Sequence, residues 1–367
     1  MRFFIIDTYY SSFLEHFYLS RPSLSQRSYY EQKKALLQEQ FGLADFYSKN
    51  LKALGQIAEE FIVNSECLQK KWAEENDIKT GYDVLSKLPY FRNQTKGNWI
   101  KKVVLAQVRE FRPDIIYVQD DSFLDIGFLA KLKAETRLLV RQIASPIDDP
   151  GQLDVYDLII TAAQNFHQQF QQLGLNSARV KLAFEPDILK RITKKKTGWQ
   201  NTFIGGFTQK HRSGTEILTK AATAVPVDFW GYGEDNLDKS SPILKRFHGQ
   251  AWGMEAYNIL ANSRIVINRH VDVAGRYAGN MRMFETTGVG TFLITDFKDN
   301  LAEFFKIGKE IETYSSPEEL IEKIKFYQKS DNARGKIARA GQTRTLNDHT
   351  YKQRMVEIIE LIKKNLK

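Results

Sequence analysis

The sequence predicts an α/β protein with two doubly wound, Rossmann-like domains that face each other across a cleft. Short apolar runs alternate with amphipathic stretches almost throughout the chain, which is the pattern of parallel sheets covered by helices. The length of 367 residues suits two cores, and an apolar fraction of 42% can fill both. The charge run Lys190–Lys196 interrupts the pattern and indicates a solvated connection between the domains.

The first half of the chain contains five apolar runs of strand length. Strands are expected at Phe3–Ile6, Ile57–Val63, Ile115–Val118, Leu138–Ile143 and Leu158–Thr161. Amphipathic helices are expected at Tyr30–Glu39, Asp45–Leu54, Cys67–Asn76 and Trp99–Phe111. This half, residues 1–186, is predicted to be one domain.

The second half repeats the alternation. Strands are expected at Thr202–Ile204, Val227–Trp230, Ile265–Ile267 and Thr291–Thr295. Helices are expected at Gly214–Ala224, Met254–Asn262, Asn280–Thr287, Pro317–Lys329 and Asp331–Leu346. Residues 187–350 are therefore a second predicted domain. A last helix within 351–367 can cross back to the first one.

Composition narrows the class of protein. The single cysteine, Cys67, cannot form an internal disulfide, which is typical of a reducing compartment. We expect a cytoplasmic protein, because no signal peptide or membrane-spanning run of about 20 apolar residues is present. The net charge of +9 allows peripheral contact with the inner face of a membrane. The aromatic residues are scattered and form no nucleic-acid-binding motif, so no nucleic-acid partner is expected.

A first candidate site follows the strand that ends at Gly205-Gly206. Glycine lets a ligand approach the backbone, and Lys210, His211 and Arg212 come just before a helix, whose N-terminus favours an anion. This segment can bind a diphosphate. The alternative is an ordinary strand–turn–helix connection with a basic surface loop.

A second candidate site surrounds the predicted strand Ile265–Ile267. Asn268 and His270 follow its carboxyl end, and Asn280 opens the next helix. Arg282 and Glu285 are three residues apart on that helix, so they can reach the same edge. A carboxylate suits ribose hydroxyls and an arginine suits a phosphate. The alternative is a structural ion pair worth about 0.3 kcal/mol.

Several segments, taken in order, resemble the C-terminal domain of the spore-maturation CgeB-like glycosyltransferases, which belong with the group-1 glycosyltransferases of GT-B fold. The segments are Tyr257–Ala261, Asn268–His270, Met281–Glu285, Gly290, Gly308–Ile311, Glu319-Leu320, Ile337–Gly341 and His349–Tyr351. The N-terminal half resembles the same family more loosely, through Met1–Asp7, Tyr29–Gln32 and Gln69–Ala73.

The resemblance implies a donor site for a nucleoside-diphosphate sugar. Glu285 matches the glutamate that binds the donor ribose, and Lys210 or Arg212 matches the basic residue that neutralises the diphosphate. The wider group often carries a second glutamate eight positions earlier, where this chain has Tyr277. The substitutes available in this loop are Asn268, His270, Asn280 and Arg282.

The implied reaction uses basic side chains and a helix N-terminus, so no metal or other cofactor is expected. An inverting enzyme also needs a base from the first domain. The favoured candidate is Asp120, which follows the strand Ile115–Val118, with His16 and Asp7 as further candidates. The acceptor is left open between a glycan, a lipid-linked molecule and a protein. A binding module without catalysis is the rival hypothesis, because the glutamate pair is broken at Tyr277.

Overall fold

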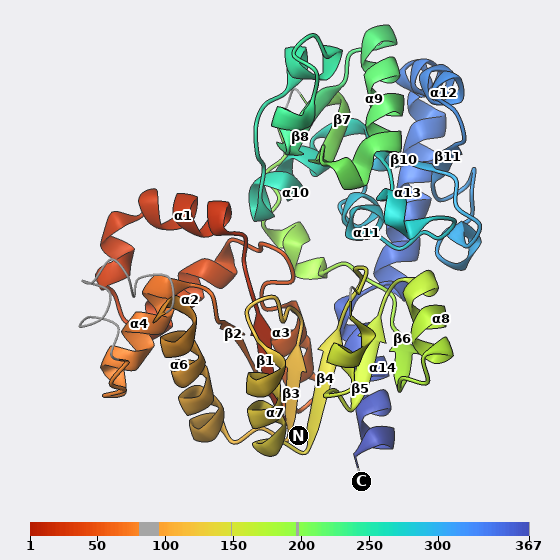
Figure 1. Ribbon diagram of the computed structural model, residues 1–367. Coiled ribbons are helices and arrows are strands. Elements are labelled where there is room, and N and C mark those ends of the chain that lie inside the picture. The colour runs from red at the N-terminus through yellow and green to blue at the C-terminus, as the bar shows by residue number, and fades with distance from the viewer. Residues whose placement is uncertain (81–94, 148, 196–197, 367) are drawn as a thin grey trace. The chain divides into compact units, whose positions relative to one another are not determined.

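The computed structural model describes residues 1–80, 95–147, 149–195 and 198–366, and it confirms the predicted α/β fold with two parallel sheets (Figure 1). The chain forms two compact units. Unit 1 comprises Met1–Thr161, His167–Val180 and Met355–Lys367. Unit 2 comprises Ala162–Phe166 and Lys181–Arg354.

Unit 1 is built on a parallel sheet with the strand order β2-β1-β3-β4-β5-β6. The strands are β1 Arg2–Asp7, β2 Ile57–Ile62, β3 Ile115–Val118, β4 Leu138–Gln142, β5 Leu158–Thr161 and β6 Ser177–Arg179. The helices around it are α1 Ser11–Leu19, α2 Tyr29–Gln38, α3 Phe46–Ala53, α4 Glu66–Glu75, α6 Thr95–Phe111, α7 Ile126–Ala134, and most of α8 Gln164–Gln172 and of α14 Tyr351–Asn365.

Strand β1 of unit 1, which lies between β2 and β3, is apolar on both faces. The side chains of Phe3–Ile6 in β1 are fully buried, as expected for a strand covered by helices on both sides. The chain leaves β1 toward β2 on one side and places β3 on the other. The order of the strands therefore reverses between β1 and β3, and ligands of open α/β sheets bind at the carboxyl end of such a switch point.

Unit 2 has a parallel sheet with the order β11-β10-β9-β7-β8. The strands are β7 Trp199–Gly206, β8 Asp228–Tyr232, β9 Ser263–Asn268, β10 Phe292–Asp296 and β11 Glu312–Tyr314. The helices are α9 Arg212–Ala224, α10 Gly253–Ala261, α11 Met281–Gly288, α12 Pro317–Lys329 and α13 Asp331–Asp348. The switch point of this sheet lies between β7 and β9.

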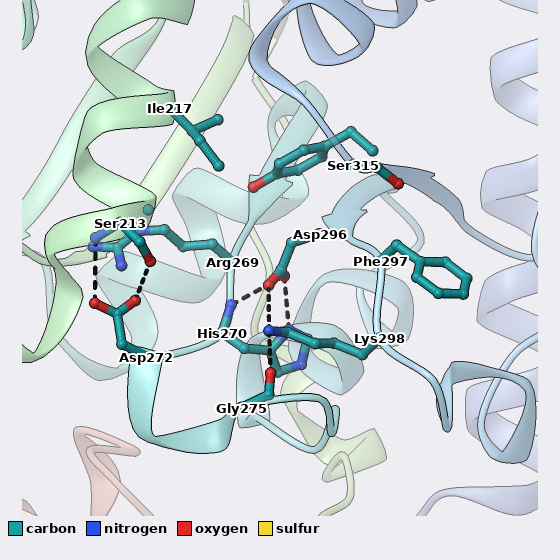
Figure 2. A pocket seen from close by; sticks show the side chains of 12 residues that line it. Ser213, Ile217, Arg269, His270, Asp272, Gly275, Asp296, Phe297, Lys298 and Ser315 are labelled. Atoms are coloured by element: carbon teal, nitrogen blue, oxygen red, sulfur yellow. Dashed lines mark hydrogen bonds and ion pairs between the residues drawn. The ribbon is translucent and has the colours of Figure 1, made fainter.

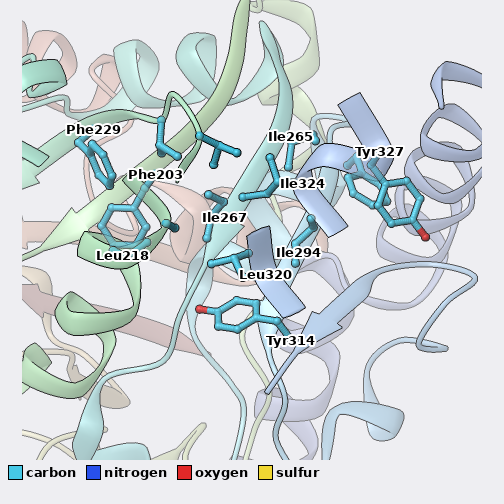
Figure 3. Close-up of a cluster of buried hydrophobic side chains, with 14 of the residues drawn as sticks. Phe203, Leu218, Phe229, Ile265, Ile267, Ile294, Tyr314, Leu320, Ile324 and Tyr327 are labelled. Carbon is cyan, nitrogen blue, oxygen red and sulfur yellow. The ribbon is translucent and has the colours of Figure 1, made fainter. Parts of the chain in front are cut away.

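One face of the second sheet is packed by helices α9 and α12, which contact each other. Figure 3 shows the apolar core beneath them, where Leu218 of α9 and Leu320 of α12 meet the strand residues Ile267 and Ile294. All four side chains are fully buried. This packing fixes the carboxyl ends of the strands, from which the candidate site is built.

Short 3₁₀ turns connect several of these elements. They are η1 Pro22–Gln26, η2 Pro150–Leu153, η3 Pro186–Lys190, η4 Gln209–His211, η5 Glu234–Asn236, η6 Pro242–Arg246, η7 Asp272–Ala274 and η8 Leu301–Glu303. Within the described part of the chain, no helix is both long and apolar enough to cross a bilayer.

Candidate functional site

Three successive side chains at the carboxyl end of β9 contact three different neighbours. Asn268 bonds to β10 and to the residue before α11, Arg269 reaches β7 and α9, and His270 reaches the end of β10. Strand β9 ends at Asn268, so the next two residues no longer follow the alternation of the pleat. One short segment therefore organises the carboxyl edge of the sheet in unit 2.

Asn268 and Asn280 form a reciprocal amide pair. Asn280 Nδ2 donates to Asn268 Oδ1 at 2.9 Å and to the carbonyl of Arg269 at 3.0 Å. Asn280 occupies the N-cap position of α11, but its side chain makes no capping hydrogen bond. The first N–H groups of α11 therefore receive no cap from this side chain, and a helix N-terminus of that kind favours an anion.

Arg269 lies at the switch point between β7 and β9. Its side chain is 6% exposed, and Nη2 donates to the carbonyl of Gly206 at 2.7 Å. Among the described residues, no acceptor lies within hydrogen-bond distance of its buried Nε and Nη1. Burial lowers the pKa of Arg269. Burying a guanidinium whose N–H groups have no acceptor costs free energy, and an anionic ligand would supply the missing acceptors.

Gly214 in the first turn of α9 makes room for this guanidinium. A Cβ at Gly214 would lie 2.2 Å from Cδ and 2.6 Å from Nη1 of Arg269. Only a residue without a side chain allows the helix to approach the arginine so closely. The glycine at position 214, where the helix Gly214–Ala224 was predicted to begin, is therefore explained by Arg269, which the sequence analysis did not assign to the site.

His270 is held by a carboxylate. Its Nδ1 lies 2.7 Å from Asp296 Oδ1, and its backbone N–H donates to the same oxygen at 3.0 Å. Burial opposes ionisation of Asp296, but the hydrogen bond from His270 and the nearby charges of His270 and Lys298 outweigh burial and lower its pKa. The Nε2 atom of His270 is buried and has no partner among the described residues. An acceptor on a ligand could bind there when Nε2 carries a proton.

Gly214, Arg269 and His270 line one cavity of about 400 Å³ at the carboxyl edge of the sheet (Figure 2), whereas Asn268 and Asn280 are not among its lining residues. Arg269, His270 and Asp272 come from the segment after β9, Asp296 ends β10, and Phe297 and Lys298 follow it. The remaining lining residues are Ser213, Gly214, Ile217, Gly275, Tyr314 and Ser315. The cavity thus combines cationic groups with the N-terminus of α9, and it has the character of an anion site.

The predicted basic loop lies around η4 and the start of α9. Lys210 and Arg212 are exposed, and Arg212 Nε lies 3.6 Å from Glu216. His211 bonds through Nδ1 to the hydroxyl of Thr208 at 2.9 Å, and burial followed by the charge of Arg269 lowers its pKa. None of these three side chains lines the cavity, and Gly206 contributes its carbonyl to Arg269.

Glu285 and Arg282 form the predicted pair on α11. Arg282 Nη1 lies 2.7 Å from Glu285 Oε2, and the hydroxyl of Tyr257 donates to Glu285 Oε1 at 3.4 Å. Both side chains are mostly buried, and the buried Arg282 Nε has no partner among the described residues. The pair does not line the cavity of Arg269, so ribose binding by Glu285 stays a prediction.

The two predicted catalytic residues lie in unit 1. Asp120 follows β3, and its carboxylate accepts hydrogen bonds from the Thr8 hydroxyl and from the N–H and hydroxyl of Ser122. His16 is an exposed residue in the last turn of α1. Asp120 is therefore held by hydrogen bonds at the end of a strand, whereas the side chain of His16 is exposed on a helix.

Of the residues that line the cavity, the sequence analysis named only His270 as a site residue, and Arg269 and Asp296 are the most informative of those it missed. Arg269 stood inside a segment that was singled out, but a sequence does not reveal that its side chain turns back toward β7. Asp296 directly follows the predicted strand Thr291–Thr295 and ends β10 in the structure, and an acidic residue at that position is a usable signal for a ligand edge. Across the described residues, no group of three histidine, cysteine, aspartate or glutamate side chains is placed to bind a metal ion.

Comparison with known proteins supports the fold and relates part of the second half of the chain to a known family. Residues 210–360 match the glycosyl transferase-like family. No curated protein matches the chain. Among solved structures, HepE from Anabaena in complex with UDP-glucose matches with a TM-score of 0.60 and 13% identity, over 99% of this chain and 100% of that one.

Two further solved structures cover the whole chain. A glycosyltransferase from Rickettsia africae has a TM-score of 0.57 and 11% identity, over 100% of this chain and 98% of its own. Sucrose-phosphate synthase from Thermosynechococcus elongatus has a TM-score of 0.58 and 10% identity, over 99% and 98%. At these identities the likeness concerns the fold. The chain therefore has the fold of the GT-B glycosyltransferases, and its residues 210–360 carry the sequence pattern of the glycosyl transferase-like family.

Proposed function

We propose that the protein is a glycosyltransferase that moves a sugar from a nucleoside-diphosphate sugar to an acceptor hydroxyl. The observation that carries this proposal is Arg269, a buried guanidinium with two N–H-bearing atoms that have no acceptor among the described residues. It lies at the switch point of the sheet, beside the partnerless Nε2 of His270. A diphosphate presents the acceptor oxygens that both groups lack.

In the proposed reaction, the acceptor oxygen forms a bond to the anomeric carbon while the bond from that carbon to the diphosphate oxygen breaks. The electron pair stays on the diphosphate, and the acceptor loses its proton. Negative charge grows on the leaving phosphate, which preorganised cations stabilise. We assign this role to Arg269 and His270, and we propose that the reaction needs no metal ion. Retention of full activity in the presence of a chelator is expected.

The proposed donor site also includes residues of α11. Glu285 binds the ribose hydroxyls, and the N-terminus of α11, next to Asn280, adds to the anion site. The likeness to HepE, whose crystal structure contains UDP-glucose, makes uridine diphosphate the first nucleotide to test. The CgeB-like resemblance supports a place in bacterial glycan or glycoconjugate synthesis, with a glycan, a lipid-linked molecule or a protein as acceptor.

Calorimetric titration with uridine diphosphate tests the donor site. Arg269→Lys keeps the charge but loses the planar set of donors, so we expect at least about tenfold weaker binding. Arg212→Lys is the matched variant on the exposed loop, and we expect it to change binding little, because Arg212 is 79% exposed. Unchanged binding in Arg269→Lys would overturn the assignment. Weaker binding in Arg212→Lys alone would instead assign diphosphate binding to the exposed basic loop that the sequence analysis favoured.

A binding module without catalysis is the second candidate. Tyr277 favours it, because it stands eight residues before Glu285, where the wider family often has a glutamate. Release of uridine diphosphate from a nucleotide sugar by the purified protein decides between the two. Tight binding without turnover, across a panel of donors and acceptors, would support the binding module.

A further inference from the structure

A second cavity lies in unit 1, at the edge of its sheet. Its volume is about 580 Å³, and its lining residues come from α2, from β2, and from α3 with the residues just before it. Strand β2 is an edge strand, with β1 as its neighbour on one side. All lining residues lie between Tyr29 and Glu60, so the cavity belongs to unit 1 alone.

Two helices flank this edge on opposite faces of the sheet. Glu59 and Glu60 are adjacent on β2, so their side chains point to opposite faces. Lys33 of α2 forms an ion pair with Glu59 at 2.9 Å, and the N–H of Ser48 in α3 donates to Glu60 Oε1 at 2.8 Å. The cavity therefore lies between α2 and α3 along the edge of β2.

The lining carries both signs of charge, with four lysines and three acids. Lys33 is fixed by Glu59 and by the ring of Phe61, whose centroid lies 4.6 Å from its Nζ. Lys34 and Lys52 are exposed, and neither has a carboxylate within ion-pair distance among the described residues. These two ammonium groups can bind a negatively charged group of a ligand.

The inner wall offers groups that match hydroxyls. The hydroxyl of Tyr29 is buried and has no hydrogen-bond partner among the described residues. Burial, followed by the charge of Glu59, raises the pKa of Tyr29, so this hydroxyl keeps its proton and can donate. Burial raises the pKa of Glu60 to about 7, against the hydrogen bonds from Ser48. A surface that only presents lysines to water would not contain a buried hydroxyl without a partner.

The outer wall adds an aromatic surface. The ring of Tyr30 lines the cavity and is 69% exposed. Tyr30 and Lys34 are four residues apart on α2, so the ring and the ammonium group lie on the same face of the helix. The acids among the lysines disfavour a polyanion such as a nucleic acid, but carboxyl groups are good partners for hydroxyls.

We infer that this cavity binds a saccharide unit that carries a negative charge. Tyr29 and Glu60 bond to its hydroxyls, its ring packs on Tyr30, and its charged group lies between Lys34 and Lys52. This inference goes beyond glycosyl transfer and does not depend on it, because every residue that it uses belongs to unit 1.

The test uses methyl β-glucuronide and methyl β-glucoside, which differ only in a carboxylate and a hydroxymethyl group. Their dissociation constants for the purified full chain are measured by nuclear magnetic resonance titration. We expect the glucuronide to bind roughly 5- to 25-fold more tightly, because an exposed ion pair contributes up to about fivefold and two lysines take part. Tighter binding of glucose 6-phosphate than of the glucuronide would support the same site with a phosphate as the charged group.

Four variants assign the contacts. The double variant Lys34→Gln/Lys52→Gln should bind the glucuronide as weakly as the glucoside, while Lys131→Gln, an exposed lysine of α7 outside the cavity, should behave as the wild type. Tyr30→Ala should weaken both glycosides equally, because packing on the ring does not depend on charge. Tyr29→Phe should also weaken both, and it should be at least as stable as the wild type in urea, because it removes a buried hydroxyl without a partner.

The outcomes keep this site separate from the donor site. Equal affinity of the wild type for the two glycosides, binding of neither, or an unchanged preference in the double lysine variant would overturn the inference. Inorganic phosphate that binds as tightly as the glucuronide would reduce the site to an anion site without sugar recognition. Uridine diphosphate should bind equally to the wild type and the double lysine variant. Arg269→Lys should keep its affinity for the glucuronide, so a failure of the proposed function would leave this result intact.

Discussion

The carboxylate of Asp272 accepts hydrogen bonds from the backbone N–H and the hydroxyl of Ser213, in the first turn of α9. The position beside a helix N-terminus is the one that a phosphate group prefers. Asp272 therefore occupies part of the anion site that Arg269 and His270 leave unsatisfied. A diphosphate entering the cavity has to compete with this carboxylate or displace it.

Removing that negative charge should strengthen anion binding. In Asp272→Asn the amide oxygen can still accept from Ser213, while the repulsion of a diphosphate is lost. We expect the affinity for inorganic pyrophosphate and uridine diphosphate to rise roughly two- to fivefold, the range of a single charge at a helix terminus. Calorimetric titration measures this change.

Asp238→Asn is the control for this variant, since Asp238 accepts in the same way from the N–H and hydroxyl of Ser240 but does not line the cavity. It should leave the affinity unchanged. Weaker binding in Asp272→Asn would mean that the carboxylate itself takes part in recognition.

Gly214→Ala should displace Arg269. The new methyl group would overlap the arginine side chain, so we expect donor affinity to fall by about tenfold or more although alanine favours helix formation by about 1 kcal/mol. Gly335→Ala on α13 is the control, because the nearest atom there is the flexible end of Arg339 at 3.2 Å. Titration of both variants with uridine diphosphate measures the effect on donor binding, and urea unfolding measures the effect on stability. Wild-type affinity in Gly214→Ala would show that Arg269 can move without cost.

Asp7 should make the protein less stable as the pH rises. Its folded pKa of about 7, raised chiefly by burial, lies above the usual aspartate pKa of 3.8, so the folded state holds the proton more tightly, and this stabilisation is lost as the pH rises through 7. Asp7→Asn should therefore be more stable than the wild type at pH 8, by up to about 4 kcal/mol, since one pKa unit corresponds to about 1.4 kcal/mol. Urea unfolding at pH 5 and pH 8 measures this. An equal difference at both values would contradict the shifted pKa.

His349, in unit 2, should make the protein less stable as the pH falls. Its Nε2 bonds to the carbonyl of Phe304 at 3.0 Å, and its Nδ1 accepts from Arg354 at 2.8 Å. Burial and the charge of Arg354 lower its pKa to about 4, despite the opposing hydrogen bond to Phe304. Neutral His349 is therefore the stable form, and stability is lost as the pH falls from 6.5 toward 4, by up to about 3 kcal/mol.

His349→Gln tests this, because glutamine can donate to Phe304 and accept from Arg354 but does not titrate. We expect the variant to lose less stability than the wild type between pH 7 and pH 4.5, as measured by urea unfolding. The same pH dependence in both proteins would assign the acid sensitivity to other groups.

The sequence predicted most of the elements because their patterns are strong. The bounds of Ile115–Val118, Leu158–Thr161 and Pro317–Lys329 agree with the structure residue for residue. Helix α1 Ser11–Leu19 was not predicted, since its first residues follow two tyrosines and its N-cap Tyr10 makes no capping bond. Strand β6 Ser177–Arg179 is short and only half-buried, so it lacks the apolar run by which strands are recognised.

The candidate site was predicted in part. The segment after β9 was identified, because polar residues directly after a buried strand mark the ligand edge of a parallel sheet. Which side chain enters the cavity depends on where the chain turns after Asn268, and a sequence does not show that turn. In the same way, Asp7 and Asp120 look alike in the sequence. They differ through burial and through the hydrogen bonds of Ser122, which exist only in the folded chain.

The C-terminal helix gives the two units a defined order of completion during synthesis. Met355, Ile358 and Ile362 of α14 are almost fully buried, and the residues from Met355 onward belong to unit 1. Unit 2 ends at Arg354, so every residue of unit 2 is synthesised before the residues of α14 that complete unit 1. The unit that contains Met1–Thr161 therefore cannot complete its core until the second unit has been synthesised.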